Sequence, residues 1–134
     1  MDVISQIKKH EGLRLKSYKD TVGVLTIGYG TNLEHLEITQ ETADLWLRQE
    51  VESIIVTLEK RDWYNKLNEP RKAVLVNLAY NIGISGLLKF KKTLRYIKLD
   101  MFENAAEEML DSRWADQVHS RAVELSRQMH TGEW

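Results

Sequence analysis

The spacing of apolar residues predicts a mostly helical chain with a short β region near its N-terminus. Apolar residues recur at helical intervals over the first eleven positions, with Asp2 placed to cap the helix and Gly12 placed to end it. Between residues 13 and 30 the helical period is lost, and Tyr, Val, Thr and Ile flank a turn at Gly23. That pattern is typical of a β-hairpin.

The remainder of the chain has the pattern of a helical body. A long helix is expected from an N-cap at Thr39 to about Lys60, and a central buried helix from an N-cap at Asn68, with Pro70 in its first turn, to Gly83. Shorter helices are expected over residues 87–98, 101–112 from a cap at Asp100, and 118–129. Strands near one end and helices elsewhere define an α+β fold.

Length and composition place the chain among globular proteins. It has 134 residues, of which 43% are hydrophobic and 29% charged, and this fits a single domain with its own core. No apolar run is long enough for a transmembrane span, and the N-terminus lacks the features of a Sec-type signal peptide, so we expect no stable membrane insertion. The absence of cysteine excludes disulfides and thiolate chemistry.

The net charge of −1 argues against a general nucleic-acid binder, but the charges are strongly segregated. Residues 60–98 carry ten Lys/Arg against two Asp/Glu, whereas residues 34–59 carry one against seven and residues 99–134 carry three against eight. Two interpretations are open. In the first, the segregation reflects solvated helix faces with complementary ends. In the second, residues 60–98 present a basic surface to a polyanion.

Three polar residues in the N-terminal region are candidates for a glycosidase site. Glu11 continues the apolar stripe of the first helix and lies at its C-terminus, where burial and the helix dipole both favour the protonated form that a general acid needs. Asp20 lies in the hairpin turn and Thr26 in the return strand. Two carboxyls in unlike surroundings and a hydroxyl able to hold a water are the minimum equipment of an inverting glycosidase.

These residues also carry a family resemblance. The stretch H-E-G-L-R-L-K-S-Y-K-D-T-V-G-V-L-T-I-G-Y-G, residues 10–30, resembles the catalytic signature of the phage-type lysozymes, the muramidases or endolysins of glycoside hydrolase family 24. Residues 76–90 resemble the central helix and following loop of that family, and residues 105–122 and 131–134 resemble its C-terminal elements.

The resemblance implies a lysozyme-like fold, with a β-hairpin lobe of about residues 13–38, a helical lobe of residues 1–12 and 39–134, and an active-site cleft between them. It implies hydrolysis, with inversion, of the β-1,4 bond between N-acetylmuramic acid and N-acetylglucosamine in peptidoglycan. Glu11 would be the acid, Asp20 would assist the water, Thr26 would help place it, and Arg121 would approach the acid. The positions matched to saccharide contacts are Gly30, Asn32, Tyr80, Asn81, Thr93 and Glu108.

The chain departs from the family at two places. Thr31 stands where many relatives have His, and the segment between Thr31 and Thr39 is much shorter than in the larger members, which predicts a reduced hairpin lobe. The four histidines show no ligand spacing, so we expect no metal and no cofactor.

Two other functions remain open, an inactive or virion-associated peptidoglycan-binding protein and a lytic transglycosylase or chitinase. As an endolysin the chain would act as a monomer, would be held in the host cytoplasm before lysis, and would need a separate pore-former to reach the wall.

Overall fold

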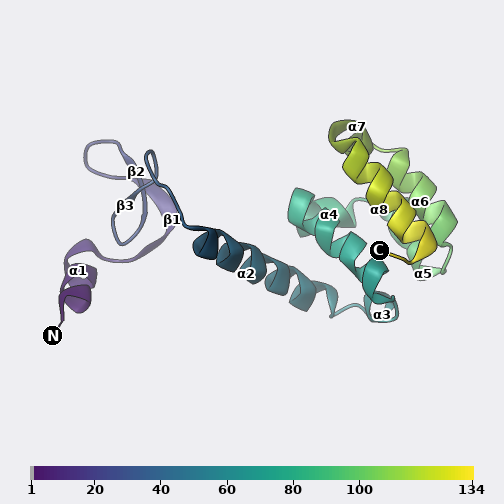
Figure 1. Ribbon diagram of the computed structural model, residues 1–134, viewed down its shortest axis with the longest axis horizontal. Helices are drawn as coiled ribbons and strands as arrows, with labels where there is room; N and C mark the ends of the chain where they lie inside the picture. The colour runs from purple at the N-terminus through teal and green to yellow at the C-terminus, as the bar shows by residue number, and fades with distance from the viewer. Residues whose placement is uncertain (1) are drawn as a thin grey trace. The chain divides into compact units, whose positions relative to one another are not determined.

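The computed structural model describes residues 2–134 as two compact units, Met1–Ala43 and Asp44–Trp134. Figure 1 labels the helices and strands of both units.

The N-terminal unit consists of one helix and a small antiparallel sheet. Helix α1 (Val3–Glu11) precedes β1 (Arg14–Lys19), β2 (Leu25–Gly28) and β3 (Thr31–Asn32), and the strand order is β1-β2-β3. The helix and the hairpin were both predicted and are confirmed. The third strand was not, because two residues are too few to show an alternating pattern.

The ends of α1 and the tip of the hairpin follow the expected local chemistry. The Asp2 side chain accepts a hydrogen bond from the Ser5 amide at 2.8 Å, and this bond holds the pKa of the Asp2 carboxyl below its usual value. At the other end Gly12 takes a φ of 72°, which favours glycine. In the hairpin turn Gly23 has a φ of 85° and its amide donates to the Asp20 carbonyl at 3.0 Å.

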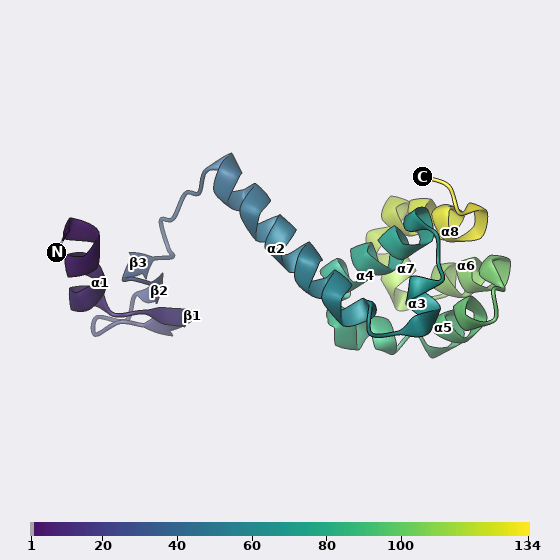
Figure 2. The ribbon, with the colours of Figure 1, turned by 90° about the horizontal axis from the view of Figure 1, so that it is seen from below.

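The C-terminal unit is entirely helical, and α4 lies at its centre. Val74, Leu75 and Leu78 of α4 are fully buried, and helices α6 and α8 pack beside one another around the same core. Figure 2 shows these helices from a second side. Its elements are α2 (Gln40–Leu58), whose first turn falls in the N-terminal unit, α3 (Asp62–Asn65), α4 (Glu69–Leu88), α5 (Lys91–Lys98), α6 (Phe102–Leu110), α7 (Arg113–Val118) and α8 (Ser120–Thr131). The helical body and the α+β class are therefore confirmed.

Several predicted helix boundaries were wrong. The central helix does leave helical geometry at Gly83, where φ is 81°, but it resumes and continues to Leu88. Asp100 does not cap the next helix, because it adopts a φ of 58° and its amide donates to the Ile97 carbonyl, which closes the end of α5 instead. The short helices α3 and α7 were not predicted.

Within residues 2–134 no single helix is long and apolar enough to cross a membrane. Helices α4 and α5 taken together have the length and composition of a membrane span, but they are bent by 96° relative to each other.

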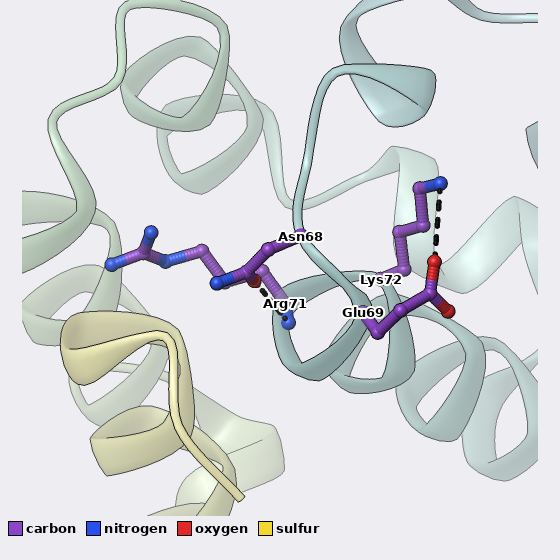
Figure 3. Close-up of polar contacts among 4 residues, drawn as sticks. All are labelled: Asn68, Glu69, Arg71 and Lys72. Atoms are coloured by element: carbon purple, nitrogen blue, oxygen red, sulfur yellow. Dashed lines mark hydrogen bonds and ion pairs between the residues drawn. The ribbon is translucent and has the colours of Figure 1, made fainter.

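Asn68 and Arg71 join the start of α4 to the end of α8. The Asn68 Oδ1 atom accepts a bond from the Arg71 amide at 3.1 Å, as Figure 3 shows, and its Nδ2 atom donates to the Gly132 carbonyl at 3.0 Å. The Arg71 guanidinium donates to the carbonyls of Met129 and His130 at 2.7 and 2.8 Å. These bonds satisfy carbonyls that the last turn of α8 leaves free. The Lys72–Glu69 ion pair in the same view spans 3.6 Å with an exposed carboxylate and contributes little stability.

The two bonds of Asn68 can be separated by substitution. Asn68→Ala removes the N-cap and the bond to Gly132, and we expect the free energy of unfolding to fall by about 2 kcal/mol, roughly half from each bond. Asn68→Asp keeps the acceptor oxygen and loses only the donor, so its loss is expected to be about 1 kcal/mol. Urea unfolding measures both, and equal losses for the two variants would contradict this division.

Candidate active site

Glu11 lies at the end of α1 with its carboxylate against the backbone of Gly30. A Cβ atom at residue 30 would stand 2.5 Å from the Glu11 Oε2 atom, which is closer than atoms of this kind approach. Gly30 also has a φ of 75° in the turn between β2 and β3. This position therefore favours glycine twice, once for its backbone angle and once for the space that the carboxylate occupies. The Glu11 side chain itself is exposed in the structure, although the helical stripe predicted a position facing the interior or a cleft.

Asp20 is held by the turn between β1 and β2. Its Oδ1 atom accepts hydrogen bonds from the amides of Val22 at 2.9 Å and Val24 at 2.8 Å. Both bonds fall on one oxygen, and within residues 2–134 no hydrogen bond reaches Oδ2. The turn thus fixes the carboxylate and leaves its second oxygen able to accept a proton.

Thr26 is in β2 and is only 5% exposed. Its hydroxyl donates to the Val24 carbonyl at 2.9 Å, so Asp20 and Thr26 bond to the two polar groups of the same residue. The lone pairs of the Thr26 oxygen remain free to accept a bond. Asn32 of β3 pairs directly with Thr26, and its side chain accepts from the Glu34 amide at 2.8 Å. The sheet therefore groups Asp20, Thr26 and Asn32, and the β2–β3 turn places Gly30 against Glu11.

The helical unit positions Tyr80 and Arg121 around a hollow of about 470 Å³. Arg121 donates from Nε to the Asn77 side chain at 2.9 Å and from Nη2 to the same oxygen at 2.5 Å. Tyr80 is 47% exposed and is therefore not a core residue. Asn77 was not among the predicted site residues, although it is a polar residue on the apolar face of the central helix. That exception to the helical pattern is the signal that could have found it.

Asn81 is held by a buried tryptophan. The Trp114 indole donates to the Asn81 side-chain oxygen at 2.8 Å, and the Trp114 ring meets Phe90 edge-on at a centroid distance of 6.3 Å. This bond orients the amide and leaves the Asn81 side-chain nitrogen free to donate to a ligand.

Thr93 and Glu108, which are distant in sequence, line one pocket of about 220 Å³. Thr93 is 2% exposed, and Glu108 is half-buried. The structure thus brings these two together, and it groups Tyr80 with Arg121 elsewhere in the same unit. Within residues 2–134, no group of three or more His, Asp or Glu side chains could hold a metal ion.

A helix and a small antiparallel sheet, followed by a helical body, are consistent with the lysozyme-like α+β fold. Residues 8–128 match the family model described as phage lysozyme, and the chain belongs to that family.

Individual relatives agree with this assignment. The chain is 26% identical over 157 residues to a probable T4-type lysozyme of Dictyostelium discoideum, covering 94% of this chain and 92% of the relative. It is 32% identical to an endolysin of Bacillus phage B103, covering 96% of this chain and 51% of that protein. It is also 28% identical to a pre-baseplate central spike protein of Enterobacteria phage T4, of which it covers 28%.

Two glycines provide a matched test of the contact between Gly30 and Glu11. Gly28 and Gly30 both have positive φ, but a Cβ atom at Gly28 would meet nothing within 4 Å. Gly30→Ala and Gly28→Ala should each lose about 1–2 kcal/mol of stability from the backbone angle. Only Gly30→Ala should displace Glu11, so we expect it to lose at least about tenfold more cell-wall turnover than Gly28→Ala.

The displacement can also be measured without substrate, from the carboxyl ¹³C chemical shift of Glu11. A shift change in Gly30→Ala that is absent from Gly28→Ala is the expected result. Equal changes in both variants would contradict the contact.

Proposed function

We propose that this protein hydrolyses the β-1,4 bond between N-acetylmuramic acid and N-acetylglucosamine in peptidoglycan, with inversion at the anomeric carbon. The observation that carries the proposal is the pair of carboxyls in unlike settings, Glu11 against the Gly30 backbone and Asp20 tied into a turn that also bonds Thr26.

Glu11 is the proposed general acid. It is the last residue of α1, and its carboxylate lies beside a glycine whose lack of a side chain leaves the backbone open to a sugar. Protonation of the glycosidic oxygen by Glu11 would let the leaving sugar depart as a neutral alcohol.

Asp20 and Thr26 are the proposed water-activating pair. The bonds on Oδ1 hold Asp20 in place, so that Oδ2 can take a proton from a water, while the Thr26 oxygen accepts a bond that orients this water. An inverting mechanism needs about 6.5–9.5 Å between the two carboxyls to leave room for that water on the opposite face of the sugar ring.

The remaining residues are proposed to bind the glycan strand. Asn32 and Gly30 would do so from the sheet, and Tyr80, Asn81, Thr93 and Glu108 from the helical unit. Arg121 is proposed as a supporting cation, with its guanidinium held by Asn77. The Trp114–Asn81 bond supports a binding role for Asn81, because it fixes which end of the amide is free.

The biological setting we propose is lysis of a bacterial host. The match to an endolysin supports it, and an endolysin acting from the cytoplasm would depend on a separate pore-former to reach the wall. The match to a central spike protein supports a second candidate, a virion-associated role for the same chemistry or for peptidoglycan binding alone.

Digestion of purified peptidoglycan, followed by identification of the products, tests the reaction. Reducing muramic ends formed with inversion are expected. Ends of the 1,6-anhydro type would indicate a lytic transglycosylase, a preference for chitin would indicate a chitinase, and binding without turnover would leave only the binding role.

Isosteric substitutions test the two carboxyls. Glu11→Gln should reduce turnover by about 10²–10⁴-fold, the range for a lost general acid, with an unchanged unfolding midpoint. Asp20→Asn keeps an oxygen that can accept from Val22 and Val24, so the turn should persist while turnover falls sharply. Near-full activity in Glu11→Gln would show that the acid is elsewhere.

The Thr26 hydroxyl can be removed without leaving an orphaned carbonyl, because the Val24 carbonyl also accepts from the Asp20 amide at 2.9 Å. Thr26→Val should therefore fold with little loss of stability but turn over about a hundredfold more slowly, since the water is no longer held in place. Thr26→Ser retains the hydroxyl and should recover most of the rate. A serine variant as slow as the valine variant would point to packing rather than to the hydroxyl.

A further inference from the structure

Helix α5 exposes a row of cations. Its inner side packs Thr93, Leu94 and Ile97 into the core, each 6% exposed or less. Its outer side carries exposed cationic residues, and one more precedes the helix. They are Lys89, Lys91, Lys92, Arg95 and Lys98. Figure 2 shows α5 at the lower edge of the helical unit.

Three of these cations surround an apolar hollow of about 620 Å³. Lys91, Arg95 and Lys98 line it, at intervals of four and three residues that place them on one side of the helix. The other lining residues are leucines, Leu88, Leu94 and Leu99, and no acidic residue lines the hollow. Leu99 is 61% exposed, so this apolar surface is open to a partner.

These cations form no ion pairs that would account for them. The one Lys/Arg–carboxylate pair within 4 Å in residues 2–134 is Lys72–Glu69, which lies on α4. Lys98 places its ammonium 5.6 Å from the centroid of the Trp63 ring, a cation–π contact that adds no opposite charge. Glu108 and Asp111 lie in the neighbouring pocket beside Lys91, but neither borders the hollow itself.

We propose that the hollow bounded by Leu88, Leu99 and the cations of α5 docks onto the surface of an acidic phospholipid bilayer. A lipid supplies both halves of the required chemistry, a phosphate for the cations and an acyl or glycerol portion for the leucines. A phosphodiester wall polymer would match the cations but would leave the leucines unpartnered. This inference goes beyond the proposed hydrolysis and does not depend on it.

The expected strength follows from the number of cations. Each Lys or Arg close to an acidic membrane surface increases the affinity about fivefold, and the attraction decays within a Debye length of roughly 10 Å at 0.1 M salt. The binding should therefore be peripheral, reversible and strongly weakened by salt.

The experiment measures flotation of the protein with vesicles of phosphatidylcholine alone or with 40% phosphatidylglycerol. It uses the Glu11→Gln chain, so that failure of the hydrolytic proposal cannot affect the result. Binding is expected only to the acidic vesicles. The paired variant Arg95→Gln/Lys98→Gln should bind about 30-fold more weakly. The control Lys66→Gln/Arg113→Gln removes the same net charge from exposed positions elsewhere in this unit and should bind as the parent does.

Leu99→Asn tests the apolar half of the site at an exposed position, where the cost in folding should be small. It should weaken binding to acidic vesicles severalfold without changing its salt dependence. Peptidoglycan turnover of Arg95→Gln/Lys98→Gln in the active chain should equal that of the parent.

Several results would overturn the proposal. The first is an absence of binding to acidic vesicles. The second is equal weakening of vesicle binding by the two paired variants. The third is binding to soluble polyphosphate that is as tight as binding to vesicles and is unaffected by Leu99→Asn. The last would assign the cations to a phosphodiester polymer.

Discussion

The carboxylate of Glu11 occupies the space that a side chain on residue 30 would need, and the chemistry of the N-terminal unit depends on this close approach. A helix end and a strand turn can come so near only where one of them lacks a Cβ atom, and the positive φ of Gly30 selects the same residue type independently. A single glycine thus determines both the path of the β2–β3 turn and the position of the proposed acid.

Asp20 meets a different constraint, because the same side chain serves the turn and the proposed reaction. Its Oδ1 atom accepts hydrogen bonds from two amides of the turn, and its Oδ2 atom is the oxygen proposed to act on the water. An Asp in a tight turn is ordinary local chemistry, so the turn alone does not show a catalytic role. What distinguishes this one is the connection through Val24 to the buried hydroxyl of Thr26. A buried hydroxyl directed at a carbonyl that already has a donor is not needed for the fold, which is why Thr26 is the most informative residue of the three.

The sequence predicted the elements that have strong local signals and missed those that depend on tertiary structure. Caps at Asp2, Thr39 and Asn68 were correct, since a side-chain acceptor three residues before an amide acts locally. Asp100 is also a residue type that favours N-caps, but the left-handed backbone that closes α5 prevents it from capping α6. The three proposed catalytic residues, Glu11, Asp20 and Thr26, were all predicted from spacing and resemblance. Asn77 was not, because its partner Arg121 lies 44 residues away and no local pattern joins them.

The segregation of charge has different causes at different positions of the basic stretch, residues 60–98. Arg71 is committed to the carbonyls of α8 and stacks on Phe102 at 3.7 Å from the ring centroid, and its partial burial lowers its pKa from the usual value. Lys72 pairs with Glu69. Three exposed cations of α5, Lys91, Arg95 and Lys98, border a hollow with leucine walls, and within residues 2–134 none of them has a carboxylate within 4 Å. The charges of α4 are accounted for within the fold, and a basic surface on α5 stays a proposal. Salt weakens an exposed row of cations far more than it weakens the partly buried bonds of Arg71. The salt dependence of membrane binding and that of folding should therefore separate the proposed role of the α5 cations from the structural role of Arg71.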